Sequence, residues 1–581
     1  MSDVQLSRYN QGRSLSRSSF SPVVAQPSIL NPLSKMKTLS LAFGLLFSLS
    51  VQAQYKSQVW CPDNGDGTYT NPVLFADYSD PDVCAVGDDY YLTASSFNCI
   101  PGLPILHSRD LVNWTIIGHA LQEQLPKEIF DQPQHGKGVW APAIRHHNGL
   151  FYIYWGDPDL GIFMVQSERP DSGWSRPVCV ISGRGMIDPC PLWDNDGRCY
   201  LVNGWAASRA GLNSVLTVRE LSADGTRAIG KPRIVFDGGQ ENFTSEGPKF
   251  YKRDGYYWIM NPAGGVEMGW QLAMRSKSPY GPYEWRRVMW QGKTTVNGPH
   301  QGAWVHTAQG EDWFLHFNDR FAYGRVVYLQ PVDWSSGWPI MGNHGEPYTT
   351  YRKPKTAPTP IPAVSTAGNP QESDEFNDGQ LGLQWQWHAN YDQLYGMPTA
   401  DGTYRLYTYD LPQDFRSLWQ VPNLLLQKPT APRFTATAKV RFASKGDHQY
   451  GGLVMMGRDY SALVIYRQGD NFLLQRHTCM GADEEGTEIQ QTLATLQPTE
   501  CDTIPYSPAI YLDLYLRMTV RDGLCSYSYS LDGKRYKDAG PSFTMRQGKW
   551  IGAKFGFVSE CHDRKGANRG WLDVDWIRIT Q

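Results

Sequence analysis

Three short motifs place an acidic residue beside Pro or Gly. "YSDPDV" carries Asp80, "MIDPCP" carries Asp188 and "TSEGPKF" carries Glu246. Hydrolysis of a glycosidic bond uses such groups: one carboxylic acid donates a proton, and one carboxylate acts as base or nucleophile. A third carboxylate can keep the proton on the acid by like-charge repulsion. Each motif alone is an ordinary turn or a solvated acid, so the chemistry depends on whether the fold brings the three together.

An internal repeat would do so. Five Gly-containing turns, each followed by an aromatic strand-like run, lie about 50–60 residues apart, a spacing typical of propeller blades; their glycines are Gly87, Gly149, Gly197, Gly255 and Gly310. Each turn joins two strand-like segments, which predicts a β-hairpin. Five such units predict a five-bladed β-propeller. An irregular β-sandwich is the alternative.

The acids hold similar positions in these repeats. Asp80 lies seven residues before its glycine, Asp188 and Glu246 nine, Trp140 nine and His300 ten. If the strand entering each hairpin is the innermost one, all five side chains point into one funnel at the propeller axis. Unpaired buried carboxylates are unfavourable in a core, so their convergence beside aromatic residues indicates an active site. A structural histidine is the plainer interpretation of His300, because a lone histidine is more often structural than catalytic.

The rest of the chain divides by composition. Residues 36–53, "MKTLSLAFGLLFSLSVQA", have the charged start, apolar run and small-residue end of a secretory signal peptide. Residues 1–35 are then expected to be an upstream segment that precedes the true start at Met36. Residues 351–370 are rich in Pro, Ala and Thr and predict a linker. The expected domains are therefore a propeller over 54–350 and a second domain over 371–581.

Charge and cysteine content exclude other classes of protein. The formal net charge is −3 and there is no basic run, so nucleic acid is not an expected partner. The ten cysteines show no zinc-binding spacing. Buried thiols or disulfides are expected, with Cys84, Cys99 and Cys190 near the motifs. Aromatic residues make up 13% of the chain, which suits both strands and sugar stacking.

Six segments carry a family resemblance. In order they are "YSDPDVCAVGDDYYLTASSF", "PGLPILHSRDLVNW", "WAPAIR", "MIDPCPLW", "SEGPKFY" and "GPHQGAWV". Over about residues 65–345 the chain resembles glycoside hydrolase family 43, five-bladed propeller enzymes that act on xylan and arabinan side chains. The resemblance implies that Asp80 is the general base, Asp188 raises the pKa of the acid and orients it, and Glu246 is the general acid. It also implies inversion, with base and acid roughly 6.5–9.5 Å apart.

The same resemblance implies a pocket for one terminal sugar. Phe97 and Trp140 would form apolar walls, and His300 would lie under the floor. Arg325 would hydrogen-bond substrate hydroxyls, with a surface arginine on an outer strand as the alternative. Asp77 and Asp82 are expected to support Asp80, and strand alternation places Asp82 one step deeper as a structural residue.

The C-terminal segment contains strand-like runs such as "FTATAKVRF" and "YLDLYLRMTV", which predict a concanavalin A-like β-sandwich of jelly-roll type. Its ends, "ESDEFND" and "WLDVDWIRI", resemble the paired terminal strands of the accessory domain of many family 43 xylosidases. That resemblance suggests a structural calcium ion held by Asp374 and Asp575. The domain is expected to close one side of the pocket rather than to bind sugar itself.

The predicted protein is thus all-β, a propeller followed by a sandwich. The expected function is an exported, periplasmic or secreted, inverting exo-glycosidase without a required cofactor. Its expected substrate is a hemicellulose-derived oligosaccharide of the xylan or arabinoxylan type, from which it releases xylose or arabinose. The alternatives are an endo-acting arabinanase and a non-catalytic carbohydrate-binding propeller. No transmembrane segment is expected, and the sequence predicts neither the preferred sugar nor the oligomeric state.

Overall fold

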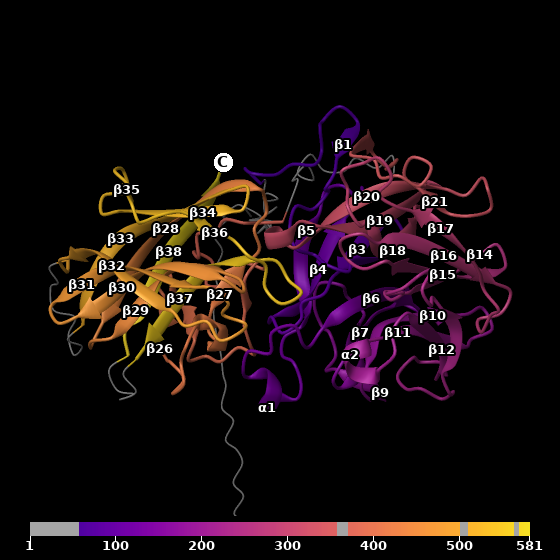
Figure 1. Ribbon diagram of the computed structural model, residues 1–581, viewed down its shortest axis with the longest axis horizontal. Coiled ribbons are helices and arrows are strands. Elements are labelled where there is room, and N and C mark those ends of the chain that lie inside the picture. Colours follow the sequence, from indigo (N-terminus) through magenta and orange to yellow (C-terminus); the bar gives the residue numbers. More distant parts are fainter. Residues whose placement is uncertain (1–56, 357–369, 500–508, 563–568) are drawn as a thin grey trace, which may run out of the picture. The chain divides into compact units, whose positions relative to one another are not determined.

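The structure is a computed structural model that describes residues 57–356, 370–499, 509–562 and 569–581. The expected upstream segment, the signal peptide and most of the linker lie outside these residues. Strands dominate the described chain (Figure 1). The helices there are single turns: α1 (Lys127–Phe130), α2 (Ala207–Ala210), η1 (Phe321–Tyr323) and η2 (Leu418–Gln420).

Five four-stranded antiparallel sheets form the propeller, and each follows chain order. The first two blades are β2 (Asp82–Val86) to β5 (Thr115–Leu121), through β3 (Asp89–Thr93) and β4 (Gly102–Ser108), and β6 (Trp140–His147), β7 (Leu150–Asp157), β8 (Gly161–Ser167) and β9 (Val178–Ser182). The third comprises β10 (Met186–Trp193), β11 (Cys199–Trp205), β12 (Val215–Leu221) and β13 (Arg233–Asp237). The fourth comprises β14 (Lys249–Arg253), β15 (Tyr256–Ala263), β16 (Trp270–Ser276) and β17 (Glu284–Met289). The fifth comprises β18 (His300–His306), β19 (Asp312–Asp319), β20 (Arg325–Asp333) and β21 (Ile340–Met341).

The predicted turns are the first hairpins of these blades. Each turn glycine lies between the first and second strand and has a positive φ, from 63° at Gly87 to 83° at Gly197. A side chain is strained in that region, whereas glycine enters it freely. The five-fold repeat read from the sequence is therefore confirmed.

A second repeat lies at the head of each first strand. One residue in each blade has a left-handed backbone: Asp80 (φ 55°), Ala141 (33°), Asp188 (56°), Gly247 (54°) and Gln301 (54°). In three blades the strand register also shifts there, between Trp140 and Ala143, Ile187 and Cys190, and His300 and Gly302. The first strands contact one another around the axis, β2 with β6 and β18, and β10 with β6 and β14. This kink therefore turns five equivalent positions toward the same axial space.

The propeller ring is closed by pairing between distant segments. Strand β1 (Thr68–Thr70) precedes the five blades in the sequence. It pairs with β22 (Thr350–Arg352), which follows them. Next to it, Leu74 and Val327 of β20 exchange both main-chain hydrogen bonds, at 3.2 and 3.0 Å. The first and fifth blades are thereby held together by the start and end of the same domain.

The second domain consists of two large sheets. One has the order β23 (Gln386–Trp387), β27 (Leu425–Gln427), β37 (Lys554–Cys561), β29 (Gln449–Met456), β30 (Tyr460–Gln468), β31 (Asn471–Cys479) and β32 (Ile489–Leu496), with β26 (Tyr409–Asp410) on β37. The other has β24 (Gly396–Pro398), β25 (Tyr404–Tyr407), β38 (Trp571–Thr580), β28 (Arg433–Ser444), β33 (Ile510–Arg521), β34 (Leu524–Ser530) and β35 (Lys537–Asp538), with β36 (Phe543–Thr544) on β34.

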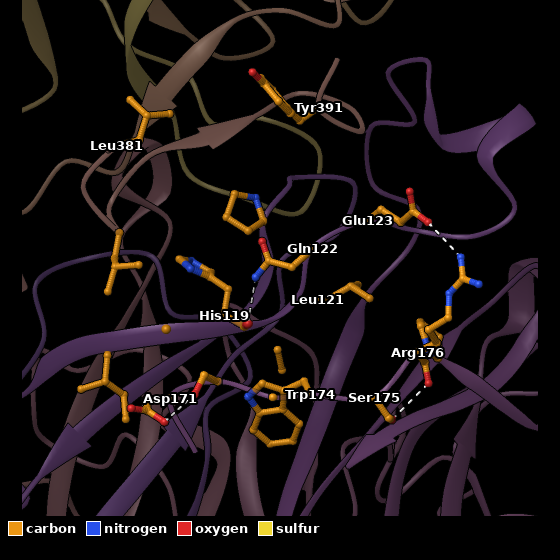
Figure 2. Close-up of a pocket in the computed structure, with 18 of the residues that line it drawn as sticks. His119, Leu121, Gln122, Glu123, Asp171, Trp174, Ser175, Arg176, Leu381 and Tyr391 are labelled. Atoms are coloured by element: carbon orange, nitrogen blue, oxygen red, sulfur yellow. Dashed lines mark hydrogen bonds and ion pairs between the residues drawn. The ribbon is translucent and has the colours of Figure 1, made fainter. Parts of the chain in front are cut away.

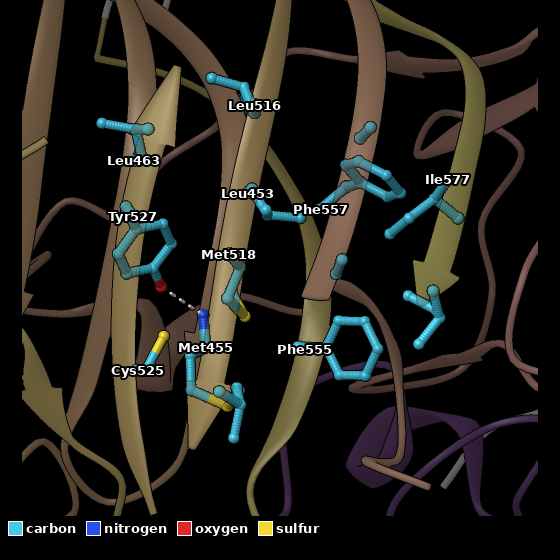
Figure 3. Close-up of a cluster of buried hydrophobic side chains, with 14 of the residues drawn as sticks. Leu453, Met455, Leu463, Leu516, Met518, Cys525, Tyr527, Phe555, Phe557 and Ile577 are labelled. Atoms are coloured by element: carbon cyan, nitrogen blue, oxygen red, sulfur yellow. Dashed lines mark hydrogen bonds between the residues drawn. The ribbon is translucent and has the colours of Figure 1, made fainter. Parts of the chain in front are cut away.

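Alternating residues of the two sheets face each other and form one apolar core (Figure 3). Leu453 and Phe557 come from the first sheet, and Leu516, Met518 and Ile577 come from the second. The period of two that identified these runs in the sequence is what places their apolar residues on one face. The expected pairing of the domain's ends is also present, since Asp374 and Ile577 exchange main-chain hydrogen bonds at 2.9 and 2.8 Å.

Candidate active site

The left-handed turn at the head of the first blade positions Asp80. Its Oδ2 accepts a hydrogen bond from the Ser95 hydroxyl at 2.6 Å, and its Oδ1 accepts one from Arg325 Nη1 at 3.0 Å. Ser95 Oγ in turn accepts the main-chain N–H of Ala141, in the second blade, at 2.8 Å. These two donors fix the orientation of the Asp80 carboxyl group. The side chain lines a pocket while being only 5% exposed, so it is a fixed acceptor facing a small space.

Asp188 and Glu246 line the same pocket from the third and fourth blades. The N–H of Gly247 donates to Asp188 Oδ2 at 2.8 Å, which joins the two motifs directly. Glu246 is partly exposed, and none of the described residues hydrogen-bonds its carboxyl group. The pocket thus holds one acid that is free to reach a ligand and two that are anchored.

Burial and mutual repulsion separate the behaviour of these acids. Burial raises the pKa of Asp188, and the nearby charge of Asp80 adds to this effect, although the Gly247 N–H opposes it. Burial also raises the pKa of Glu246, and the charge of Asp188 raises it further. A raised pKa favours the protonated form of Glu246, which a proton donor requires. The charge of Asp188 thus acts in the direction that the like-charge prediction requires, and the catalytic roles of the three acids stay a prediction.

Aromatic side chains surround the acids. Phe97 and Trp140 line the pocket, as predicted, with their rings edge to face at 6.3 Å. Trp550 lines it as well, edge to face with Trp140 at 6.2 Å. Trp550 belongs to the β-sandwich, in the loop before β37, so this domain does close one side of the pocket. Sequence reasoning missed the residue because its loop, "RQGKWIGAK", has no strand or turn pattern; an apolar tryptophan between glycines is the only signal it offers.

His300 lies behind the pocket rather than on its surface. It is 1% exposed, and its Nδ1 donates to the Gly298 carbonyl at 2.5 Å. Burial lowers its pKa to about 4, so the imidazole is neutral. The neighbouring Gln301, which carries the left-handed backbone, lines the pocket instead. His300 is thus buried next to a residue that lines the pocket, and its support of the pocket floor stays a prediction.

Arg325 and Asp82 occupy different levels of the site. The structure excludes a surface position for Arg325, since it lines the pocket, contacts Asp80 and stacks over Phe317 at 5.0 Å. Asp82 is wholly buried and accepts from the Ile144 N–H at 2.7 Å and from Arg145 Nη1 at 2.6 Å. Asp82 therefore ties the first two blades together beneath the pocket and does not face it.

The pocket is small, about 100 Å³. A much larger hollow of about 840 Å³ is lined by β5, residues 171–177 and residues 381–391 (Figure 2). Figure 2 shows Glu123 paired with Arg176, at 3.8 Å, and Trp174 on the opposite side from Tyr391. Asp171, which also lines it, is paired with Arg169 at 2.7 Å. Its acids are thus paired with surface arginines, and the three motif acids line the small pocket instead.

The two aspartates expected to hold calcium have other partners. Asp374 accepts the main-chain N–H groups of Phe376 and Gly382, at 2.9 and 3.1 Å, and the indole N–H of Trp385 at 2.8 Å. Asp575 is paired with Lys439 at 2.5 Å. Calcium prefers a shell of free oxygen ligands, and the described residues contain no group of three or more His, Cys, Asp or Glu side chains arranged for a metal. These contacts do not fit a shared calcium ion, and the calcium site stays a prediction.

Comparison with known proteins agrees with the two-domain organisation. Residues 69–339 match Glycosyl hydrolases family 43, and residues 373–580 match the Beta xylosidase C-terminal Concanavalin A-like domain. A putative beta-xylosidase of Xylanibacter ruminicola is 35% identical over 514 residues, covering 86% of this chain and 87% of that protein. The chain belongs to glycoside hydrolase family 43. It is therefore a glycosidase.

Other relatives of this family 43 glycosidase differ in name. A beta-xylosidase of Formosa agariphila is 31% identical over 89% of this chain and 90% of its own length. A non-reducing end alpha-L-arabinofuranosidase of Bacteroides ovatus is also 31% identical, over 71% and 78%. The crystal structure of the GH43 BlXynB protein from Bacillus licheniformis superposes with a TM-score of 0.73 at 25% identity, covering 88% of this chain and 99% of that one.

Two further features of the family 43 chain are the state of its cysteines and the length of its apolar helices. The nine cysteines among the described residues are all free thiols, including Cys84, Cys99 and Cys190. In the described part of the chain, no helix is long and apolar enough to cross a membrane.

Proposed function

We propose that this glycosidase is an inverting exo-enzyme that releases terminal xylose or arabinose from hemicellulose-derived oligosaccharides. The observation that carries the proposal is a pocket of about 100 Å³, walled by Phe97, Trp140 and Trp550, with the three acids inside it. Such a small pocket suits one terminal sugar ring, whereas an endo-acting enzyme needs room for sugars on both sides of the bond.

The roles follow from the surroundings of each acid. Glu246 holds a proton, and its carboxyl group has no hydrogen-bond partner among the described residues. It therefore protonates the oxygen of the leaving sugar as the bond from that oxygen to the anomeric carbon breaks. A water molecule attacks the anomeric carbon from the opposite face and loses a proton to Asp80. Asp188 keeps Glu246 protonated through its charge. Exchange with solvent then removes the proton from Asp80 and restores the one on Glu246.

Paired nitrophenyl glycosides test the substrate class. We expect hydrolysis of a β-D-xyloside, an α-L-arabinofuranoside or both, and the ratio of kcat/KM values identifies the preferred sugar. Proton NMR during the first minutes tests inversion, because a β-xyloside then gives α-xylose as the first product. Initial β-xylose would contradict the proposed mechanism. Long products from a polymer, without monosaccharide, would contradict exo action.

Export is also proposed, on the apolar segment at residues 36–53, which lies outside the described structure. The mature N-terminus of protein recovered from the culture medium or periplasm tests it. A chain retained in the cytoplasm with this segment attached would contradict it.

A further inference from the structure

Asp77 lies three residues before the base and holds two distant parts of the chain. It is 3% exposed and does not line the pocket. Its Oδ1 accepts the main-chain N–H of Arg325 at 2.8 Å, and its Oδ2 accepts the main-chain N–H of Gly552 at 2.8 Å. The first donor belongs to the fifth blade and the second to the β-sandwich. One carboxylate, just before the turn that carries Asp80, therefore contacts both the fifth blade and the β-sandwich.

Each donor is next to a group that faces the substrate. The side chain of Arg325 lines the pocket and contacts Asp80. Gly552 comes two residues after Trp550, which forms the wall supplied by the sandwich. The backbone of Asp77 is also held from the sandwich side, because Lys428 Nζ donates to its carbonyl oxygen at 2.5 Å. Movement of Asp77 would therefore displace a hydroxyl-binding arginine and an aromatic wall together.

Close packing leaves this junction little freedom. A Cβ on Gly324 would lie 2.4 Å from Asp77 Cγ, and a Cβ on Gly552 would lie 2.7 Å from the main-chain carbonyl of Tyr323. The next residue, Ala553, donates its N–H to the Ala322 carbonyl at 2.7 Å. Neither contact distance admits a side chain. The loop that carries Trp550 is thus pressed against the segment that leads into Arg325, with Asp77 between them.

We propose that Asp77 is a positioning residue, which fixes Arg325 and Trp550 relative to Asp80 and so sets how the terminal sugar is held. It acts through these two residues and does not touch the substrate. The proposal rests on the proposed function, since it assigns both residues to sugar binding. It predicts that the pocket is complete only when the sandwich loop is attached at this point.

The Asp77→Asn variant tests the assignment. Its amide keeps the shape but has one acceptor oxygen, so one of the two N–H donors loses its partner. Loss of a hydrogen bond to a charged acceptor corresponds to a roughly ten- to hundredfold fall in kcat/KM, and we expect much of it as a higher KM. The matched control is Asp110→Asn. Asp110 is 5% exposed and accepts the N–H groups of Val112 and Asn113, at 3.0 and 2.7 Å. Its contacts lie away from the pocket, so we expect a lower Tm and unchanged kcat/KM.

A double-mutant cycle separates positioning from general destabilisation. If Asp77 acts partly through Trp550, then Asp77→Asn should lower kcat/KM at least threefold less in a Trp550→Ala background than in the wild type. Assays are made well below the Tm of every variant. Equal losses in both backgrounds, or a loss in Asp110→Asn as large as that in Asp77→Asn, would overturn the proposal.

Gly552→Ala provides a second route if Asp77→Asn does not fold. The new methyl group displaces the loop while Asp77 stays in place. Its loss of kcat/KM should likewise shrink in the Trp550→Ala background, and an undiminished loss contradicts the proposal. If the wild type hydrolyses neither nitrophenyl glycoside, the proposed function fails separately. The same cycles are then measured as Kd values for xylose and arabinose, and additive effects on binding again count against Asp77.

Discussion

Both domains bury acidic residues, but only the propeller turns them toward a pocket. In the sandwich, Glu560 is wholly buried, and burial raises its pKa well above the ordinary value. Nearby, Glu488 is paired with His477 at 3.1 Å and accepts the Tyr460 hydroxyl at 2.8 Å. In the propeller, Glu246 also has a raised pKa, yet its carboxyl is partly exposed and unpaired within the described chain. A shifted pKa alone therefore does not identify a catalytic acid; access and convergence with other acids do.

The strongest test of this contrast is Asp80→Asn. An amide at this position cannot accept a proton from water, so we expect kcat to fall roughly 10²–10⁴-fold on every substrate. Steady-state kinetics on an aryl glycoside and on an oligosaccharide measure it, with sugar binding as the check of folding. Near-normal turnover would remove Asp80 as the base.

The next test compares the two protonated glutamates directly. Glu246→Gln should lower kcat by about 10²-fold or more on an oligosaccharide, and much less on a dinitrophenyl glycoside, whose leaving group needs no proton. Glu560→Gln replaces one neutral group by another and should leave both rates unchanged. Similar kinetic losses in the two variants would contradict the distinction between the domains.

A smaller loss of activity is expected from Asp188→Asn, together with a shift in the pH dependence of kcat/KM. Glu246 must be protonated, so kcat/KM falls as the pH rises through its pKa. Asp188 carries a charge that helps to raise this pKa, and its removal should move the alkaline limb of the profile to lower pH, with roughly tenfold lower kcat/KM at neutral pH. A pH–rate profile of both proteins measures the shift. An alkaline limb that stays in place or moves upward would exclude this role.

We expect Glu488→Gln to leave the kinetics unchanged and to affect only stability. Burial alone would raise the pKa of Glu488, but the charge of His477 and the hydrogen bonds to the carboxylate lower it overall. A lowered pKa stabilises the fold above the ordinary glutamate value of about 4.3, and this stabilisation is lost as the pH falls through the folded-state pKa. The variant should lose about 1–3 kcal/mol at neutral pH and lose less than the wild type on acidification. Thermal unfolding between pH 3 and 7 checks both.

Local patterns predicted much of the molecule. The turn glycines marked the blades because a positive φ is needed at each hairpin, and the motif acids followed from their places before those turns. The distance from the left-handed position to the turn glycine varies between blades: it is seven residues from Asp80, nine from Asp188 and eight from Gly247, which follows Glu246. Trp550 and the contacts of Asp77 depend on how the two domains pack together, and a distance of 475 residues leaves no local pattern to read.

The repeated left-handed position has a use for protein engineering. All five blades have a left-handed residue at the head of the first strand, but this residue is an acid in only two of them, Asp80 and Asp188. Ala141 and Gln301 hold the equivalent position in two other blades and line the same pocket. Exchanging these side chains would therefore relocate charge or hydrogen-bonding capacity around a bound sugar without redesigning any loop, because the backbone turn is already present at each position.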